Sequence, residues 1–413
     1  MLKRLLCLLL PSLLALCLCG GCQDARAASS QILALNVGLD VGESRAIRLT
    51  VQLPEVGSSG SGGGGGSDSP SGSDTPSRVD QSLVQNGYVL TQVEGDTVAD
   101  CLTMLTTALP REVTFLHIRG LYFSESFARS GQLFQALTAL LQPRLTRPGA
   151  TVYLCLGRAE DVLKAQTPFL GTRLSKSQDS RQQELQSISV VPDALLVEVY
   201  NRLLGQGADA VAVLAAVNNG NAIEASLGGG EQPADYLAGE LPYNSISPVS
   251  YFGSAVFRGA QPALFLTGYE TQLMNLCLGN FQQGTIEVRD ESAGRSLSLH
   301  QNKAPSISVD LDGETPLVRI RLELEASAYV NTQLEDPQLL RQRAEALLTE
   351  DLTQLLLRLQ QAGCDPLDLE GHARMHALTN RQWQQMEWDL AYPSACFSVQ
   401  VQLTLRANAA TIP

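Results

Sequence analysis

The chain has 413 residues, a formal net charge of −13 and 44% hydrophobic residues, with a mean hydropathy of +0.01. At about 100–200 residues per domain, this length predicts two to four domains with buried cores. The ordinary hydrophobic fraction excludes wholesale disorder, and the acidic balance argues against binding of nucleic acid and against broad adhesion to anionic lipid.

The first 22 residues have the order of a secretory signal. Lys3 and Arg4 precede an apolar run at 5–18, and two glycines come directly before Cys22. The run is too short to span hydrocarbon comfortably, which takes about 20 residues. We therefore predict that residues 1–21 are a signal peptide and not part of the fold.

The small residues before Cys22 predict a lipoprotein cleavage site, because the peptidase must approach the backbone closely there. The Cys22 thiol would receive a diacylglycerol with palmitate-type acyl chains and become the first residue. The usual pattern has Leu three positions before the lipidated Cys, where this chain has Cys19. A plain signal peptide with an incidental Cys is the alternative. Cys19 is a poorer candidate for the anchor, because bulky Leu18 directly precedes it.

Five cysteines follow the proposed anchor and contain no CxxC pair. They are Cys101, Cys155, Cys277, Cys364 and Cys396. An odd, scattered set in an exported protein does not indicate a disulfide framework. We expect most of them to be small buried hydrophobic residues.

The N-terminal part alternates strand and helix patterns. Residues 31–53 predict a β-hairpin, and 57–77 predict a flexible Gly/Ser loop inserted into the first domain. Further strands are predicted at 88–93, 115–123, 151–156 and 208–216, and helices at 97–109, 125–141, 160–165 and 193–204. Residues 171–187 are polar and Gln-rich and predict a loop.

The C-terminal third gives the clearest periodicity. Short strands at 254–257 and 263–266 and a helix at 270–278 precede it. Apolar residues then alternate at 307–311, 318–324 and 399–405, and a long amphipathic helix is predicted at 339–359. We also predict a helix at 368–389, and an antiparallel sheet packed by long helices.

Candidate sites are few. His372 and His376 have metal-ligand spacing, but Ala373 stands where a zinc protease of the HExxH type needs Glu. A solvated helix face is the simpler interpretation, and we predict no metal, no cofactor and no catalytic residue. Tyr243, Tyr251 and Phe252 could line a ligand groove, although a packed loop is favoured.

Trp383 and Trp388 are candidates for a partner interface. If both lie on one helix, they point about 140° apart, so one can enter the core while the other lies nearer the surface. An aromatic side chain beside flexible polar residues can act as an interface anchor. Burial of both tryptophans in the core is at least as good an interpretation.

The order of several segments resembles the C-subunits of spore germination receptors, the GerAC-like or Ger(x)C lipoproteins. ILALNVGLDVGE…IRLTVQLP is similar to that family's opening hairpin, and VEGDTVADCLTMLTTALPREVTFLHIRGLYFSESFAR to its Gly-x-Thr helix and following strand. GSAVFRGAQPALFLTGYETQLMNLCLGN resembles its central hairpin and helix. QAGCDPLDLEGHARMHALTNRQWQQMEWDLAYPSACFSVQVQLTL resembles its C-terminal Asp, Trp-containing helix and last strand.

The resemblance implies a lipid-anchored, non-enzymatic receptor subunit. Such proteins lie on the outer face of the cell membrane or spore inner membrane, beside membrane-embedded A- and B-type subunits. The implied fold is α+β, with three mixed α/β domains. We place these at 22–200 (an N-terminal α/β domain), 201–300 (a middle domain) and 301–413 (a C-terminal sheet-plus-helix domain).

Two other functions stay open at this point. A solute-binding lipoprotein of a transporter would share the anchor and the acidic body, but it would have two similar α/β lobes. A surface-anchored hydrolase would need a convergent catalytic or metal cluster, to which no motif points.

Overall fold

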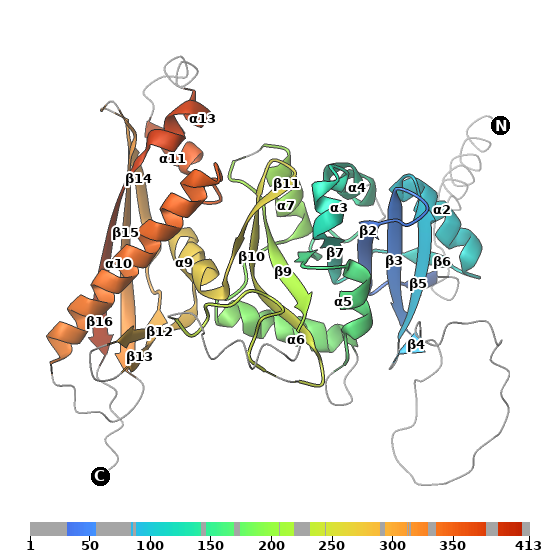
Figure 1. The fold of residues 1–413 in the computed structure, drawn as a ribbon, viewed down its shortest axis with the longest axis horizontal. Helices are drawn as coiled ribbons and strands as arrows, with labels where there is room; N and C mark the ends of the chain where they lie inside the picture. The colour runs from blue at the N-terminus through green and yellow to red at the C-terminus, as the bar shows by residue number, and fades with distance from the viewer. Residues whose placement is uncertain are drawn as a thin grey trace, which may run out of the picture.

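The computed structural model describes residues 31–54, 84–85, 88–141, 146–168, 174–205, 207–218, 232–243, 245–289, 294–311, 313, 315–328, 336–376 and 387–406. These form two main sheets that lie one after the other along the long axis of the molecule (Figure 1). The predicted mixed α/β fold is confirmed. The Gly/Ser segment at 57–77 lies outside the described residues, so its flexibility stays a prediction.

The first sheet has nine strands in the order β11-β10-β9-β8-β7-β2-β3-β5-β4. Strands β2, β7, β8 and β9 pair in parallel, and the others pair antiparallel. Their bounds are β2 (Asn36–Val41), β3 (Ile47–Pro54), β4 (Val84–Gln85), β5 (Tyr88–Gly95), β7 (Gly120–Ser124), β8 (Thr151–Cys155), β9 (Val211–Val217), β10 (Val249–Arg258) and β11 (Gln261–Leu266). Beside this sheet, β1 (Gln31–Leu33) pairs with β6 (Glu112–Thr114).

The domain boundary expected at residue 200 falls within this continuous sheet, because β9 pairs with β8. The separate middle domain at 201–300 stays a prediction.

One face of the nine-stranded sheet is apolar. Leu39, Leu49 and Phe123 are completely or almost completely buried there, and the Phe123 ring stacks on Phe127 of the covering helices with 6.1 Å between centroids. This layer contains α2 (Val98–Ala108), α3 (Glu125–Arg129), α4 (Leu133–Leu140) and α7 (Leu196–Leu203). The predicted single helix at 125–141 is wrong: Gly131 has a φ of 83°, which breaks the chain into α3 and α4.

The opposite face carries α5 (Ala159–Ala165) and α6 (Leu174–Ser187). The α5 helix packs closely on β2, since a Cβ at Gly38 would lie 2.8 Å from Leu163 Cδ1. The prediction of a loop at 171–187 is wrong, because α6 occupies most of that range. Only Leu174 of α6 is buried, so the helix has no apolar stripe that could have revealed it.

The predicted strand at 115–123 is also corrected. After β6 the chain turns, with the Ile118 N–H donating to the Phe115 carbonyl at 3.2 Å. Both apolar side chains are buried while His117 between them is exposed. Strand β7 begins only at Gly120.

The second sheet contains β12 (Gln283–Arg289), β13 (Gly294–His300), β14 (Ser306–Asp310), β15 (Leu317–Ala328) and β16 (Cys396–Arg406). Sequence periodicity missed the β12–β13 hairpin. The predicted antiparallel pairing is found except at β16, which pairs with β15 in parallel. The 25-residue helix α10 (Pro337–Gln361) crosses from β15 to β16 and packs on one face of the sheet (Figure 1).

Helix α9 (Gly268–Leu278) lies between the two sheets. Its Tyr269 hydroxyl donates to Asp351 Oδ2 of α10 at 2.6 Å, and its Glu270 forms an ion pair with Arg358. A second junction joins the loop before β9 to the residues after α10, because the Asp209 N–H donates to the Asp365 carbonyl and the Asp365 N–H to Asp209 Oδ2. Polar contacts at both of these junctions therefore help to join the two sheets.

Candidate functional site

Two of the three predicted site residues, Cys22 and Trp383, lie outside the described residues. Their proposed roles as lipid anchor and partner contact therefore stay predictions. The third, Trp388, is described.

Trp388 is part of the C-terminal core. Its side chain is 6% exposed and stacks on Tyr392 with 5.8 Å between ring centroids. It begins the short helix α13 (Trp388–Ala391), which runs into a 3₁₀ turn at Tyr392–Ser394. The preceding Glu387 has a non-helical ψ of 90°. The prediction that one helix runs through to Asp389 is wrong, because the helical conformation is interrupted at Glu387. The angle of about 140° between the two tryptophans, which assumes one continuous helix, therefore does not hold.

The spaced histidines belong to α11 (Leu369–His376). Within the described part of the chain, no group of three or more His, Cys, Asp or Glu side chains could hold a metal ion. Nearby Asp365 caps α11, since its two carboxylate oxygens accept from the N–H groups of Leu369 and Glu370. Burial raises the pKa of Asp365 to about 6, against the opposing effect of these hydrogen bonds.

The five cysteines that follow the proposed anchor are free thiols. Four are buried and Cys396 is exposed. Burial raises the pKa of Cys101 to about 11, and those of Cys277 and Cys364 to about 12. A nucleophilic cysteine needs a depressed pKa, so these three thiols are structural.

A cluster of buried tyrosines occupies the polar face of the nine-stranded sheet. Tyr122 of β7 and Tyr153 of β8 stack with 4.5 Å between centroids, and Tyr251 of β10 tilts against both. Burial raises the pKa of all three phenols, so they remain protonated. The strand order brings Tyr251, a candidate groove residue, against Tyr122 and Tyr153 from a distant part of the chain.

Gln166, at the end of α5, connects the tyrosines to the first strands of the sheet. Its Nε2 donates to the hydroxyls of Tyr122 and Tyr251 at 2.9 and 2.8 Å. Its backbone carbonyl accepts from the Tyr88 hydroxyl at 2.5 Å. Its Oε1 accepts from Asn36 Nδ2 at 3.4 Å. The side chain of Gln166 thus joins β2, β7 and β10, and its backbone carbonyl adds β5.

Helix α6 covers this face with amide side chains. Gln178 Nε2 donates to Gln166 Oε1 at 3.0 Å, and Gln182 Oε1 accepts from the Tyr153 hydroxyl at 3.2 Å. Arg181 lies 5.7 Å from the centroid of the Tyr251 ring. The cover is therefore polar, in contrast to the apolar helices on the opposite face.

A cavity of about 350 Å³ lies between α6 and the amino ends of β2, β7 and β8. Three amide atoms of its lining side chains are buried without a hydrogen-bond partner among the described residues: Asn36 Oδ1, Gln178 Oε1 and Gln182 Nε2. Such an unsatisfied group costs about 1–3 kcal/mol. These atoms are enclosed by the protein, and no described protein atom satisfies them. Periodicity could not reveal this site, because its residues come together only through the strand order.

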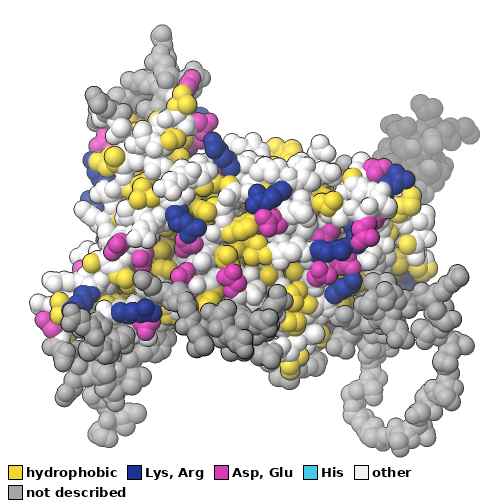
Figure 2. Space-filling view, in the orientation of Figure 1, with side chains coloured by type: hydrophobic (Ala, Val, Ile, Leu, Met, Phe, Trp, Pro, Cys, Tyr) yellow, Lys and Arg dark blue, Asp and Glu magenta, His cyan; other side chains and the backbone are white. Residues whose placement is uncertain are grey.

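At the opposite end of these strands, ionic side chains of both signs gather over α5 and the neighbouring strand ends (Figure 2). Arg48 pairs with Glu43, Glu94 and Glu160, and Glu160 also pairs with Arg158 and Lys164. The charges satisfy one another, which is typical of a structural network.

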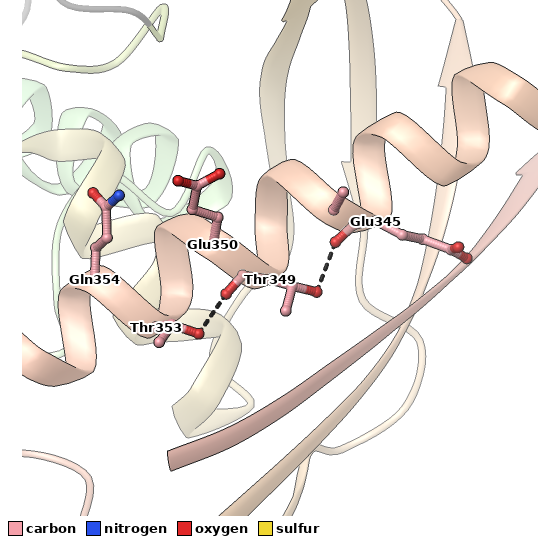
Figure 3. A pocket seen from close by; sticks show the side chains of 6 residues that line it. Glu345, Thr349, Glu350, Thr353 and Gln354 are labelled. Carbon is pink, nitrogen blue, oxygen red and sulfur yellow. Dashed lines mark hydrogen bonds between the residues drawn. The ribbon is translucent and has the colours of Figure 1, made fainter. Parts of the chain in front are cut away.

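A shallow hollow of about 590 Å³ lies along the outer side of α10 (Figure 3). The hydroxyls of Thr349 and Thr353 donate to carbonyls one turn earlier, at 2.7 and 2.6 Å. Glu345 points toward β16 and accepts from the Leu403 N–H at 2.8 Å. Glu350 and Gln354 point to the other side of the helix. This open surface has the shape of a contact area more than that of an enclosed reaction site.

Comparison with known families accounts for most of the chain. The family profile described as the spore germination protein N-terminal domain matches residues 24–217. The profile described as spore germination B3/GerAC like, C-terminal, matches residues 252–408. The chain belongs to the GerAC-like family of spore germination proteins. The resemblance noted in the sequence is thereby confirmed.

A solved structure titled the crystal structure of the GerBC protein shares the fold. It matches with a TM-score of 0.53 at 15% identity, over 89% of this chain and 96% of that chain. No curated protein sequence matches significantly. Membership of the GerAC-like family makes the chain a germinant receptor subunit. No helix among the described residues is long and apolar enough to cross a bilayer.

Proposed function

We propose that this GerAC-like chain is a lipid-anchored, non-enzymatic receptor subunit that works beside membrane-embedded A- and B-type subunits. The observation that carries the proposal is the match of both family profiles, in order, over residues 24–217 and 252–408. The anchor is Cys22, which follows Gly20 and Gly21 at the end of an apolar leader. The acyl chains hold the protein on the outer face of the membrane.

Features of the described residues support a binding role. The thiols of Cys101, Cys277 and Cys364 are buried and have raised pKa values. The nine-stranded and five-stranded sheets differ in size and strand order, unlike the two similar lobes expected of a solute-binding lipoprotein. The open surface of α10 is available to a partner protein.

The anchor is tested by Cys22→Ala, with Cys19→Ala as the matched control within the leader. Cys22→Ala should move the protein from the membrane fraction to the soluble fraction, because a chain without acyl groups at residue 22 lacks the lipid anchor. Cys19→Ala should stay with the membrane. Fractionation of spores followed by immunoblotting measures both. Membrane retention of the Cys22 variant would contradict the anchor.

The partner interface is tested by Trp383→Ala and Trp388→Ala. Because Trp388 is buried, its replacement by Ala should lower the free energy of unfolding by about 3–5 kcal/mol. Trp383→Ala should leave the circular dichroism spectrum unchanged but weaken co-purification with the membrane subunits. If both variants unfold, or neither loses the partners, this interface is wrong while the anchor proposal stands on its own test.

A further inference from the structure

The long strand β16 has a free edge on the C-terminal sheet. It pairs with β15 along its whole length, Cys396–Arg406, without a shift in register. No described strand pairs with its other edge, which lies near the left end of the molecule in Figure 1. At another edge of this sheet, on β12, the side-chain amide of Gln232 bonds both the N–H and the carbonyl of Glu287. That amide blocks β12 at this point, whereas β16 is open to a further strand over the described residues.

The backbone of alternate residues in β16 points away from β15. Neighbouring residues of a strand direct their N–H and C=O groups to opposite edges. The Leu403 N–H donates to Glu345 Oε1 of α10 at 2.8 Å, so this residue faces the outer edge. The N–H and C=O groups of the odd-numbered residues from 397 to 405 therefore point outward. Such a row of backbone groups is a template for pairing with another chain.

The strand lacks the features that usually block an edge. Native proteins protect edge strands with charged residues, Pro or bulges. From Phe397 to Leu405 the sequence has no charged residue and no Pro, and the register with β15 is unbroken. In a chain of net charge −13, an uncharged strand edge is suited to contact with protein.

The apolar side chains of β16 are also less covered than those of its neighbour. On β15, five alternate side chains are 0–2% exposed: Val318, Ile320, Leu322, Leu324 and Ala326. Their partners in register on β16 are Phe397, Val399, Val401, Leu403 and Leu405. All of these except Leu403 are only partly buried. The helix layer thus covers β15 completely and β16 incompletely, and a further layer beyond β16 would complete the cover.

A second copy of β16 fits this edge in the antiparallel direction. A two-fold axis through Val401 gives the longest overlap and sets outward backbone groups opposite outward backbone groups. On the face that α10 covers, the cross-strand pairs are Val401–Val401, Val399–Leu403 and Phe397–Leu405. On the other face they are Gln400–Gln402, Ser398–Thr404 and Cys396–Arg406. Apolar residues therefore meet apolar residues, and no pair sets like charges opposite each other, which would destabilise the ladder.

From these observations we infer that the chain forms a two-fold dimer in which the β16 strands of two copies pair antiparallel. The C-terminal sheets of the two copies become one continuous sheet, with both α10 helices on the same face. The hollow of about 590 Å³ along α10, lined in part by the small side chains of Ala346, Thr349 and Thr353, gives room for the second helix layer.

Pairing replaces one contact of the single chain. The Leu403 N–H leaves Glu345 and donates to the second copy, and the Glu345 carboxylate keeps Arg341, whose Nε lies 3.9 Å from Glu345 Oε1. The dimer does not depend on the lipid anchor or on the membrane subunits.

The mass of the full chain purified in detergent tests the dimer. Light scattering combined with absorbance and refractive index separates the protein mass from that of the detergent. The unmodified chain should have the mass of two copies, and dilution should lower it toward that of one. Val401→Pro removes an outward N–H and leaves the β15 hydrogen bonds in place. It should raise the dissociation constant of the dimer by about tenfold or more. Val401→Ile keeps the N–H and an apolar β-branched side chain, so it is the matched control and should stay dimeric.

A disulfide test fixes the register without changing the backbone. Gln400→Cys and Gln402→Cys are made in separate, differently tagged chains, each with the exposed Cys396 replaced by Ser. In an antiparallel pair without hydrogen bonds, opposite Cα atoms lie about 4.5 Å apart, which a disulfide can span. Oxidation of the mixture should therefore link the two tagged chains. Gln400→Cys mixed with Ser296→Cys is the control, because Ser296 is exposed on β13 of the same sheet, and these two chains should not be linked.

Three results would overturn the inference. One is the mass of a single copy at every concentration tested. Another is an equal dissociation constant for the Pro and Ile variants at residue 401, which would place the interface elsewhere. The last is a yield of linked chains that is no higher for the 400 and 402 mixture than for the control, and this result holds even if the Pro variant fails to fold. None of these results bears on the Cys22 anchor.

Discussion

Two helices of this protein cover sheets in opposite ways. On the C-terminal sheet, α10 buries seven side chains: Leu340, Ala344, Leu348, Leu352, Leu355, Leu356 and Leu359. On the nine-stranded sheet, α6 buries only Leu174 and meets a face of Asn, Gln and Tyr side chains through its own glutamines. The first contact is held by the hydrophobic effect and the second by directed hydrogen bonds.

The difference separates stability from specificity. Burial of apolar side chains is non-directional and stabilises a helix in many similar positions. A polar cover must satisfy each donor and acceptor, and the α6 cover leaves three amide atoms unmatched. We therefore expect α10 to contribute most of the stability and the hydrogen bonds of α6 to fix the position of that helix on its sheet.

The largest effect is expected at α10. Leu352 is fully buried, so Leu352→Ala should reduce the free energy of unfolding by about 2–5 kcal/mol. Gln354→Ala, on the exposed side of the same helix, should change it little. Hydrogen exchange of the amides in α10 and β16 measures the local loss. Equal exchange in both variants would contradict the claim that buried apolar side chains hold α10 on its sheet.

A smaller effect is expected at the floor of the α6 cavity. A Cβ at Gly120 would lie 2.7 Å from Tyr122 Cε2 and 2.8 Å from Tyr153 Cε2, so Gly120→Ala should destabilise the chain by about 1–3 kcal/mol. Gly149 lines the same cavity, but its Cβ would meet nothing closer than Arg147 Nε at 3.7 Å. Gly149→Ala is the matched control, and thermal denaturation measures both. A tolerated alanine at 120 would show that the tyrosine stack is loosely packed.

The smallest effect concerns the junction between the two regions. Burial raises the pKa of Asp365 above the 3.8 of the unfolded chain, to about 6. The folded state therefore prefers the protonated carboxyl, and this group makes folding less favourable as pH rises from about 4 to about 6. We compare the melting temperature of Asp365→Asn with that of the unmodified chain at two pH values. The difference in favour of the variant should be larger at pH 7.5 than at pH 4.5.

Glu94→Gln should change the pH dependence of stability in the opposite direction. Hydrogen bonds from the Ser44 hydroxyl, the backbone N–H groups of Glu43 and Ser44, and Arg48 hold the pKa of Glu94 well below its usual range. Its contribution is present above the unfolded pKa of about 4.5 and is lost as pH falls further. The glutamine variant should therefore lose stability at pH 7.5. Parallel pH profiles for the two variants would contradict both assignments.

The same contrast explains what the sequence could predict. The apolar stripe of α10 predicts a helix at 339–359, and the structure has Pro337–Gln361. Helix α6 has no such stripe, because the sheet face beneath it is polar. The break at Gly131 and the turn before β7 depend on local backbone geometry that periodicity does not report.

Long-range pairing limited the remaining predictions. A parallel partner for β15 requires a long crossover, and α10 supplies it, so the helix between two strands was the available signal for the parallel β16. For the cavity there was no comparable signal. Asn36, Gln166 and Tyr251 are scattered along the chain and meet only because β2, α5 and β10 share one face of the sheet.

The central claim, an anchored receptor subunit of the GerAC-like family, is tested most directly by mass spectrometry of the N-terminal tryptic peptide from spore membranes. The account predicts a peptide of residues 22–26 that begins at Cys22 and carries a thioether-linked diacylglycerol. A peptide that begins at another residue, or one that begins at Cys22 without added lipid, would contradict the account.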